Sequence, residues 1–175
     1  MKTRTMSILA LLTMSVASNR MRAEHCDSIR AQIIDRSSSE SCASPLKVCI
    51  AGKVKGNHGL NGTTYFVLDG VADAPPAAAG FKSSTGTLVY TTTQGALTVR
   101  ETGIGKFSGH PSNGYGSAVQ EVVGGTGRFT GLTGTLHISQ KDVRGTFFSD
   151  VTGQLCKAAV PAPTNPLPKS TEAVH

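Results

Sequence analysis

One glycine- and threonine-rich run, residues 124–136 (GGTGRFTGLTGTL), constrains the fold more than any other part of the chain. It holds too many glycines to form a stable helix, and its pattern is too regular for a linker. Because glycine adopts positive φ angles without steric cost, the run predicts tight turns around Arg128 and Phe129. Residues 134–136 (GTL) then begin the next expected strand. With its neighbours, this run predicts an antiparallel β-barrel built from short hairpins.

Other segments alternate apolar and polar residues with the period of two that is typical of a half-buried strand. The clearest are residues 47–55 and a hairpin of residues 86–93 and 96–102 that turns at Gln94-Gly95. Asn61-Gly62 is a strong signal for another hairpin. Further strands are expected at residues 63–69, 104–108, 115–123, 135–140 and 143–155. We therefore predict an all-β fold, a single eight-stranded antiparallel barrel with room for a packed interior or one small ligand.

The two ends of the chain break this pattern. A basic start at Lys2 and Arg4, an apolar run to Ala17 and small residues at positions 15 and 17 predict a signal peptide over residues 1–17. No other apolar run approaches the length of a membrane span. We therefore expect a secreted protein, periplasmic or extracellular, without a membrane span. The proline-rich residues 158–175 are expected to form a disordered tail.

Residues 18–46 are expected to form an N-terminal arm, which leaves residues 47–157 as the barrel domain. Within this arm, residues 27–35 (DSIRAQIID) would form two helical turns, because Ile29, Ile33 and Ile34 would share one side. The serine-rich residues that follow would end the helix.

Four cysteines, Cys26, Cys42, Cys49 and Cys156, follow the expected signal peptide. An even number of cysteines in a secreted chain predicts two disulfides, with three connectivities. Cys49 lies in the first strong strand and Cys156 ends the last, and those strands would be neighbours in a closed barrel. The favoured pairs are therefore Cys49–Cys156 and Cys26–Cys42. Zinc is not expected, because the chain lacks a Cys-x-x-Cys pair and its histidines are scattered; nothing indicates another cofactor.

The chain is basic, with 17 Lys and Arg against 11 Asp and Glu and a net charge of +6. The basic residues are spread along the sequence rather than gathered in a stripe with aromatic residues between them. Nucleic-acid binding is therefore not expected.

The turn glycines and strand threonines resemble those of secreted bacterial proteins of the allene oxide cyclase-like barrel group. The resemblance covers residues 47–156 and is carried by residues 86–88 (GTL), 97–99 (LTV), 124–129 (GGTGRF), 134–136 (GTL) and 153–156 (GQLC). The GGTGRF element is also similar to a turn of plant dirigent proteins. This resemblance implies an eight-stranded antiparallel barrel whose cavity binds a hydrophobic small molecule in some members. Members often self-associate, which implies a homo-oligomer. The catalytic residues of the plant enzymes do not match this chain position by position, so none is carried over.

Glu101 is the most interesting acidic residue, because the period of two places it on the same face as Leu97 and Val99. A carboxylate in an apolar cavity would have a raised pKa and would act as a general acid or bind a polar group of a ligand. The alternative, which we favour, is that Glu101 lies at the barrel rim or pairs with Arg100, Arg128 or Lys106.

Three further residues are candidates for ligand binding. Glu121 would face inward with Val119 and Val123, whereas Gln120 would face inward if the opposite face is buried, and the pattern does not decide between them. Tyr65 and Tyr90 would line a cavity and present a hydroxyl group, although tyrosine is also an ordinary strand residue.

Three functions follow from these observations, in order of preference. The first is a secreted barrel that binds a small hydrophobic ligand without catalysis. The second is a structural or surface-interaction protein that uses residues 18–46 and the proline-rich tail. The third is a cyclase- or isomerase-type enzyme that uses Glu101 with a tyrosine or glutamine.

Overall fold

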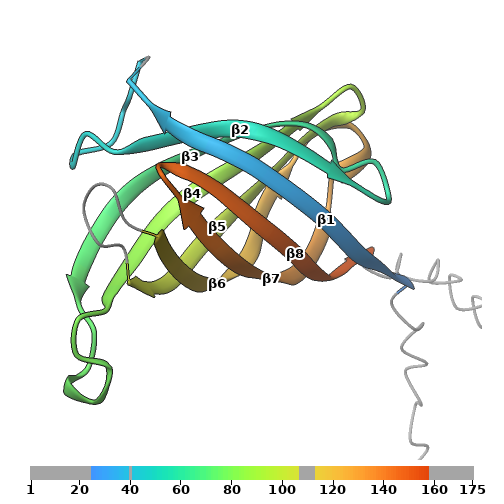
Figure 1. Ribbon diagram of the computed structural model, residues 1–175. Coiled ribbons are helices and arrows are strands. Elements are labelled where there is room, and N and C mark those ends of the chain that lie inside the picture. Colours follow the sequence, from blue (N-terminus) through green and yellow to red (C-terminus); the bar gives the residue numbers. More distant parts are fainter. Residues whose placement is uncertain (1–24, 40, 107–112, 158–175) are drawn as a thin grey trace, which may run out of the picture.

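A computed structural model describes residues 25–39, 41–106 and 113–157, which form a closed antiparallel barrel of eight strands (Figure 1). Each strand pairs with the next along the chain, and the last pairs with the first. The strands are β1 (His25–Ser38), β2 (Cys49–Gly56), β3 (Asn61–Asp73), β4 (Lys82–Thr92), β5 (Gly95–Lys106), β6 (Asn113–Gly125), β7 (Leu132–Val143) and β8 (Thr146–Lys157). Two single 3₁₀ turns, η1 (Pro76–Ala78) and η2 (Gly127–Phe129), lie in connections. The predicted all-β barrel is confirmed. The expected signal peptide and tail lie outside the described residues.

The strand β1 corrects the prediction that residues 18–46 form an arm outside the barrel. Ile29, Ala31 and Ile33 are buried and alternate with exposed residues, which is the pattern of a strand with one face in the core. Ile29 and Ile33 fit a helical period as well as a period of two, so the local pattern was ambiguous. Pairing with β2 on one side and β8 on the other makes this segment a strand. The barrel therefore begins at His25, and the separate strand expected at residues 104–108 is partly the end of β5.

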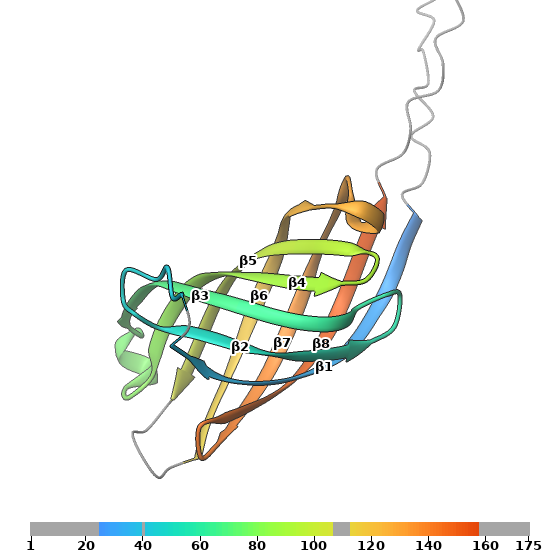
Figure 2. The same cartoon turned by 90° about the horizontal axis from the view of Figure 1, so that it is seen from above.

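The two disulfides also differ from the predicted pairs. Cys26 is bonded to Cys156, and Cys42 to Cys49. The predicted pairing assumed that β2 is the neighbour of β8, but β1 lies between them, and Cys26 stands directly opposite Cys156 in the β1–β8 register. Figures 1 and 2 show β1 and β8 side by side along the barrel. The Cys26–Cys156 bond therefore links the first and last strands at the seam that closes the sheet.

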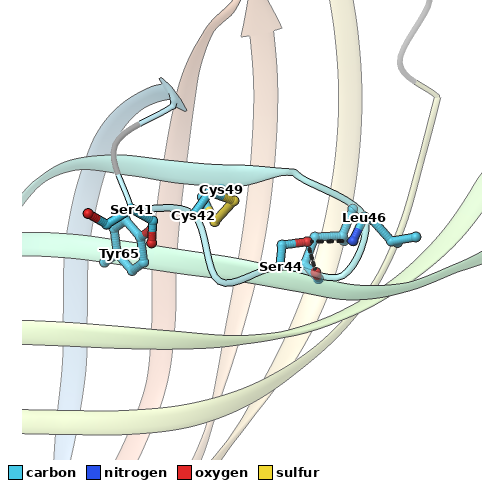
Figure 3. Close-up of a disulfide and its surroundings, with 7 residues drawn as sticks. Ser41, Cys42, Ser44, Leu46, Cys49 and Tyr65 are labelled. Carbon is cyan, nitrogen blue, oxygen red and sulfur yellow. Dashed lines mark hydrogen bonds between the residues drawn. A yellow bond between two sulfur atoms is a disulfide. The ribbon is translucent and has the colours of Figure 1, made fainter.

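The second disulfide bonds the connection between β1 and β2 to the first residue of β2, and hydrogen bonds hold this connection against β3 (Figure 3). Ser44 in this connection is buried, and its hydroxyl donates to the carbonyl of Leu68 while accepting a hydrogen bond from the backbone N–H of Leu46 at 3.0 Å. The Tyr65 hydroxyl donates to the Ser41 carbonyl at 3.4 Å. These contacts cover Cys49, which is almost completely buried although it is not an inward-facing residue.

The glycine-rich run of the sequence closes one end of the barrel. The backbone N–H of Arg128 donates to the Gln94 carbonyl at 2.8 Å, and the ring of Phe129 is fully buried beneath the turn. Gly127 has a φ of 58°, and a Cβ there would lie 2.2 Å from the Gln94 carbonyl oxygen. The close approach of the two turns therefore requires glycine at this position.

The part of the chain that the structure describes contains no helix long and apolar enough to cross a membrane. The two disulfides are compatible with folding in an oxidising compartment outside the cytoplasm.

The two disulfides should contribute unequally to stability, because they close loops of very different length. The Cys26–Cys156 bond spans a sequence separation of 130 and the Cys42–Cys49 bond one of 7. In the chain-entropy model, replacing the first pair by alanine lowers the free energy of unfolding by about 5 kcal/mol and replacing the second by about 2 kcal/mol. Guanidinium unfolding of the two double variants tests this order. Equal losses would show that the seam does not depend on its disulfide in this way.

Candidate functional site

A cavity of about 300 Å³ occupies one end of the barrel interior. It lies at the end that carries the connection between β3 and β4, on the left in Figure 1. Small inward-facing residues on β4 and β5 help to leave this space open. Toward the cavity, the inward residues of β4 change from Tyr90 and Leu88 to Gly86 and Ser84. Those of the antiparallel β5 change from Glu101 to Gly103. The opposite end is filled by large side chains, including Tyr90, Leu97, Phe129 and Leu136.

The walls of the cavity are apolar. They are formed by aliphatic and aromatic side chains from several strands, among them Ile33, Ile50, Phe66, Leu68, Leu88 and Ile138. Val71 and Ile104 lie at the mouth, where they are partly exposed to solvent. A molecule that enters from this end would bury apolar surface against these walls, which is the usual driving force for binding in such sites.

A chain of three hydrogen-bonded side chains leads from the filled part of the interior to the cavity. The Tyr90 hydroxyl donates to Gln120 Oε1 at 2.7 Å, and Gln120 Nε2 donates to Glu101 Oε2 at 2.6 Å. Tyr90 and Gln120 are fully buried, and Glu101 lines the cavity. Burial raises the pKa of Tyr90, so its hydroxyl remains a neutral donor. The chain therefore fixes the orientation of the Glu101 carboxyl group.

Asp35 on β1 brings a second carboxyl group to the cavity. It stands opposite Gly52 of β2, where an added Cβ would lie 2.2 Å from the Asp35 Cβ. Glycine at position 52 therefore leaves the space that Asp35 occupies. Asp35 is only 6% exposed, and its Oδ1 atom has no hydrogen-bond partner among the described residues. A buried polar atom without a partner is uncommon in folded proteins.

Both carboxyl groups have raised pKa values, mainly because the barrel interior removes them from water. Burial, with a smaller effect from the negative charge of Glu101, raises the pKa of Asp35 to about 7. Burial also raises the pKa of Glu101, although the hydrogen bond from Gln120 opposes this rise. The site can therefore hold and exchange a proton near neutral pH.

The alternative partners considered for Glu101 are engaged elsewhere or face another way. The guanidinium group of Arg100 pairs with Asp69, and its hydrogen bond lowers the pKa of Asp69 to about 2. Arg128 Nη1 donates to Gln94 Oε1 at 3.2 Å at the closed end of the barrel. Glu101 therefore lies inside the barrel, which the sequence analysis regarded as the less favoured alternative.

The structure brings together some of the predicted site residues and separates others. Tyr90 and Glu101 belong to the same hydrogen-bonded chain. Tyr65 and Glu121 do not line the cavity: Tyr65 contacts Ser41 from the outside of β3, and Glu121 is exposed on β6. Gln120 is the inward residue of that pair.

Asp35 was missed by the sequence analysis because it lay in the segment assigned to a helical arm. The buried alternation of Ile29, Ala31 and Ile33 continues directly to Asp35 and would have placed it inside a barrel. An acidic residue that ends such an alternating run was therefore the signal that could have identified it.

No protein-family model, curated protein or solved structure matches this chain.

The buried position of Asp35 predicts a specific dependence of stability on pH. The folded protein holds the Asp35 proton up to about pH 7, whereas the unfolded chain releases it near the ordinary pKa of 3.8. The contribution of Asp35 to the free energy of unfolding should therefore be greatest below pH 3.8, fall as the pH rises to about 7, and then level off. Relative to Asp35→Asn, which stays neutral, the wild-type protein should lose on the order of 4 kcal/mol across this range.

Denaturant unfolding at a series of pH values measures this difference. Asp150→Asn is the matched control, because Asp150 lies exposed on β8 and accepts a hydrogen bond from Gln32. Its curve should run parallel to that of the wild-type protein. Parallel curves for Asp35→Asn and wild type would contradict the assignment of a raised pKa to Asp35.

Proposed function

We propose that this protein binds a small, mostly apolar molecule inside the barrel, with the polar part of the molecule at Asp35 and Glu101. The observation that carries this proposal is a cavity of about 300 Å³ that combines mostly apolar walls with two carboxyl groups, Asp35 and Glu101, among its lining residues. Small-molecule sites in proteins typically combine an apolar lining with a few polar groups that fix the orientation of the ligand.

Two earlier expectations support the same proposal. The resemblance of the turn motifs to allene oxide cyclase-like barrels implies a cavity that binds a hydrophobic molecule in some members. The signal peptide expected at residues 1–17 would place the protein outside the cytoplasm, where the two disulfides persist. A structural role that uses the chain ends stays a prediction, because residues 18–24 and 158–175 lie outside the described residues.

A neutral fluorescent dye tests the binding function directly. N-phenyl-1-naphthylamine, whose nitrogen is not basic, should bind to the wild-type protein with a rise in fluorescence as it leaves water. Ala118→Phe places a ring in the cavity that Ala118 lines and should weaken dye binding by about tenfold or more. Val119→Phe is the matched control, because Val119 is the next residue of β6 and faces outward.

The thermal unfolding midpoint of both variants shows whether they fold. Dye binding that is unchanged in a folded Ala118→Phe variant would place the dye elsewhere. Absence of binding to the wild-type protein would contradict a cavity that accepts apolar molecules of this size.

An isomerase- or cyclase-type reaction is the second candidate for the same cavity. The observation that favours it is a pair of carboxyl groups with raised pKa values in the cavity lining, Asp35 at about 7 and Glu101 above its ordinary value, because such groups can act as general acid and base. The experiment is to extract any molecule that co-purifies with the protein from its secreting organism and to return it to the protein. A binding protein should leave the molecule unchanged, whereas an enzyme should produce a new chromatographic peak that Glu101→Gln does not produce.

A further inference from the structure

The charges that line the cavity are unbalanced. Among the described lining residues, Asp35 and Glu101 are acidic, Lys82 is basic, and the remaining side chains from all eight strands are uncharged. Lys82 lies at the start of β4 and pairs with Asp73 across the β3–β4 ladder, with 59% of its side chain exposed. The ammonium group of Lys82 is therefore balanced by its own partner at the rim, and the two inner carboxyl groups face neutral walls.

The hydrogen bonding around the carboxyl groups is also incomplete. Glu101 accepts a hydrogen bond from Gln120, but Oδ1 of Asp35 is buried without a donor from the described residues. An acceptor that is left unpaired in the interior destabilises a protein, and two carboxylates near each other also repel. A neutral hydroxyl group could donate to Oδ1, but when Asp35 is ionised a cation would also offset the repulsion between the two carboxylates.

We propose that the molecule bound in this cavity is an amphipathic amine, whose ammonium group donates hydrogen bonds to Asp35 and Glu101 while its hydrocarbon part contacts the apolar walls. This inference rests on the proposed binding function. An ammonium group has three donors and a positive charge, so it can donate to the unpaired Oδ1 of Asp35 and offset the negative charge of Glu101. A ligand with a carboxylate head group would instead be repelled by both residues when they are ionised.

Binding of an amine should depend on pH in a way that binding of an alcohol does not. An ammonium group binds best when Asp35 is ionised, and burial and the charge of Glu101 raise the pKa of Asp35 to about 7. Affinity for the amine should therefore rise as the pH rises toward 7 and then level off. The other titratable groups near this pair are Tyr90, which stays neutral, and Lys82 with Asp73 at the rim.

The experiment compares three unbranched probes of nine carbons each: nonylamine, nonanol and nonanoic acid. Each is titrated against the wild-type protein loaded with N-phenyl-1-naphthylamine. Nonylamine should displace the dye at a concentration about tenfold or more below that of nonanol, because its hydrogen bonds to carboxylates are charge-assisted. Nonanoic acid should be the weakest competitor. In Asp35→Asn and in Glu101→Gln the amine should lose most of this advantage, whereas nonanol should still displace the dye.

Asp150→Asn and Glu121→Gln are the matched controls, because both remove an exposed acid from the outside of the barrel. They should retain the preference for nonylamine, which excludes a general effect of net charge. Equal displacement by nonylamine and nonanol from the wild-type protein would overturn the inference. So would an unchanged preference for the amine in both Asp35→Asn and Glu101→Gln.

The outcomes separate this inference from the proposed function. If the dye binds and Ala118→Phe blocks it, but nonylamine displaces the dye no better than nonanol, the proposed binding function is retained and the inference of an amine ligand is rejected. If the dye does not bind to the wild-type protein, or Ala118→Phe leaves its binding unchanged, the cavity is not the binding site and both proposals fail.

Discussion

The pairing of β1 with β8 is the interaction on which the rest of the structure depends. It runs from His25 opposite Lys157 to Arg36 opposite Thr146 and converts an open sheet into a closed barrel. Without it, two long strands would present unpaired backbone groups at free edges. The Cys26–Cys156 bond ties this seam together at the end where the described chain begins and ends. The same pairing places Asp35 in the interior, so the candidate site depends on closure of the barrel.

The interior of an eight-stranded barrel is just wide enough for side chains to fill it, so the choice of side chains decides whether a cavity exists. At one end Tyr90, Phe129 and Leu136 fill the space. Toward the other end several positions that line the cavity on β4, β5, β6 and β8 are serine, glycine or alanine, and the space stays open. The cavity is thus in part a consequence of small side chains on these strands.

The acidic residues inside this cavity stabilise the fold poorly. A carboxyl group that is buried in apolar surroundings loses hydration, and only Glu101 recovers part of it through Gln120 and Tyr90. Position 52 must also be glycine, because a side chain there would occupy the space of Asp35. Local features that cost stability in this way are commonly found where a protein binds or transforms a ligand. This is why we place the polar part of the ligand at these two residues.

Most of the barrel could be predicted from the sequence, because a period of two is a local property and strands pair with their neighbours along the chain. Residues 86–102 were correctly read as a hairpin, and Glu101 was placed on the face of Leu97 and Val99 for the same reason. Three features were decided only by the tertiary structure. The run from Ile29 to Asp35 fits two periods, and only its pairing on both sides made it a strand. The disulfide partners depend on which strand lies at the seam. The inward face of β6 carries Gln120 rather than Glu121. The sequence does not show this, because both faces of the strand contain apolar residues and only the register against β5 and β7 distinguishes them.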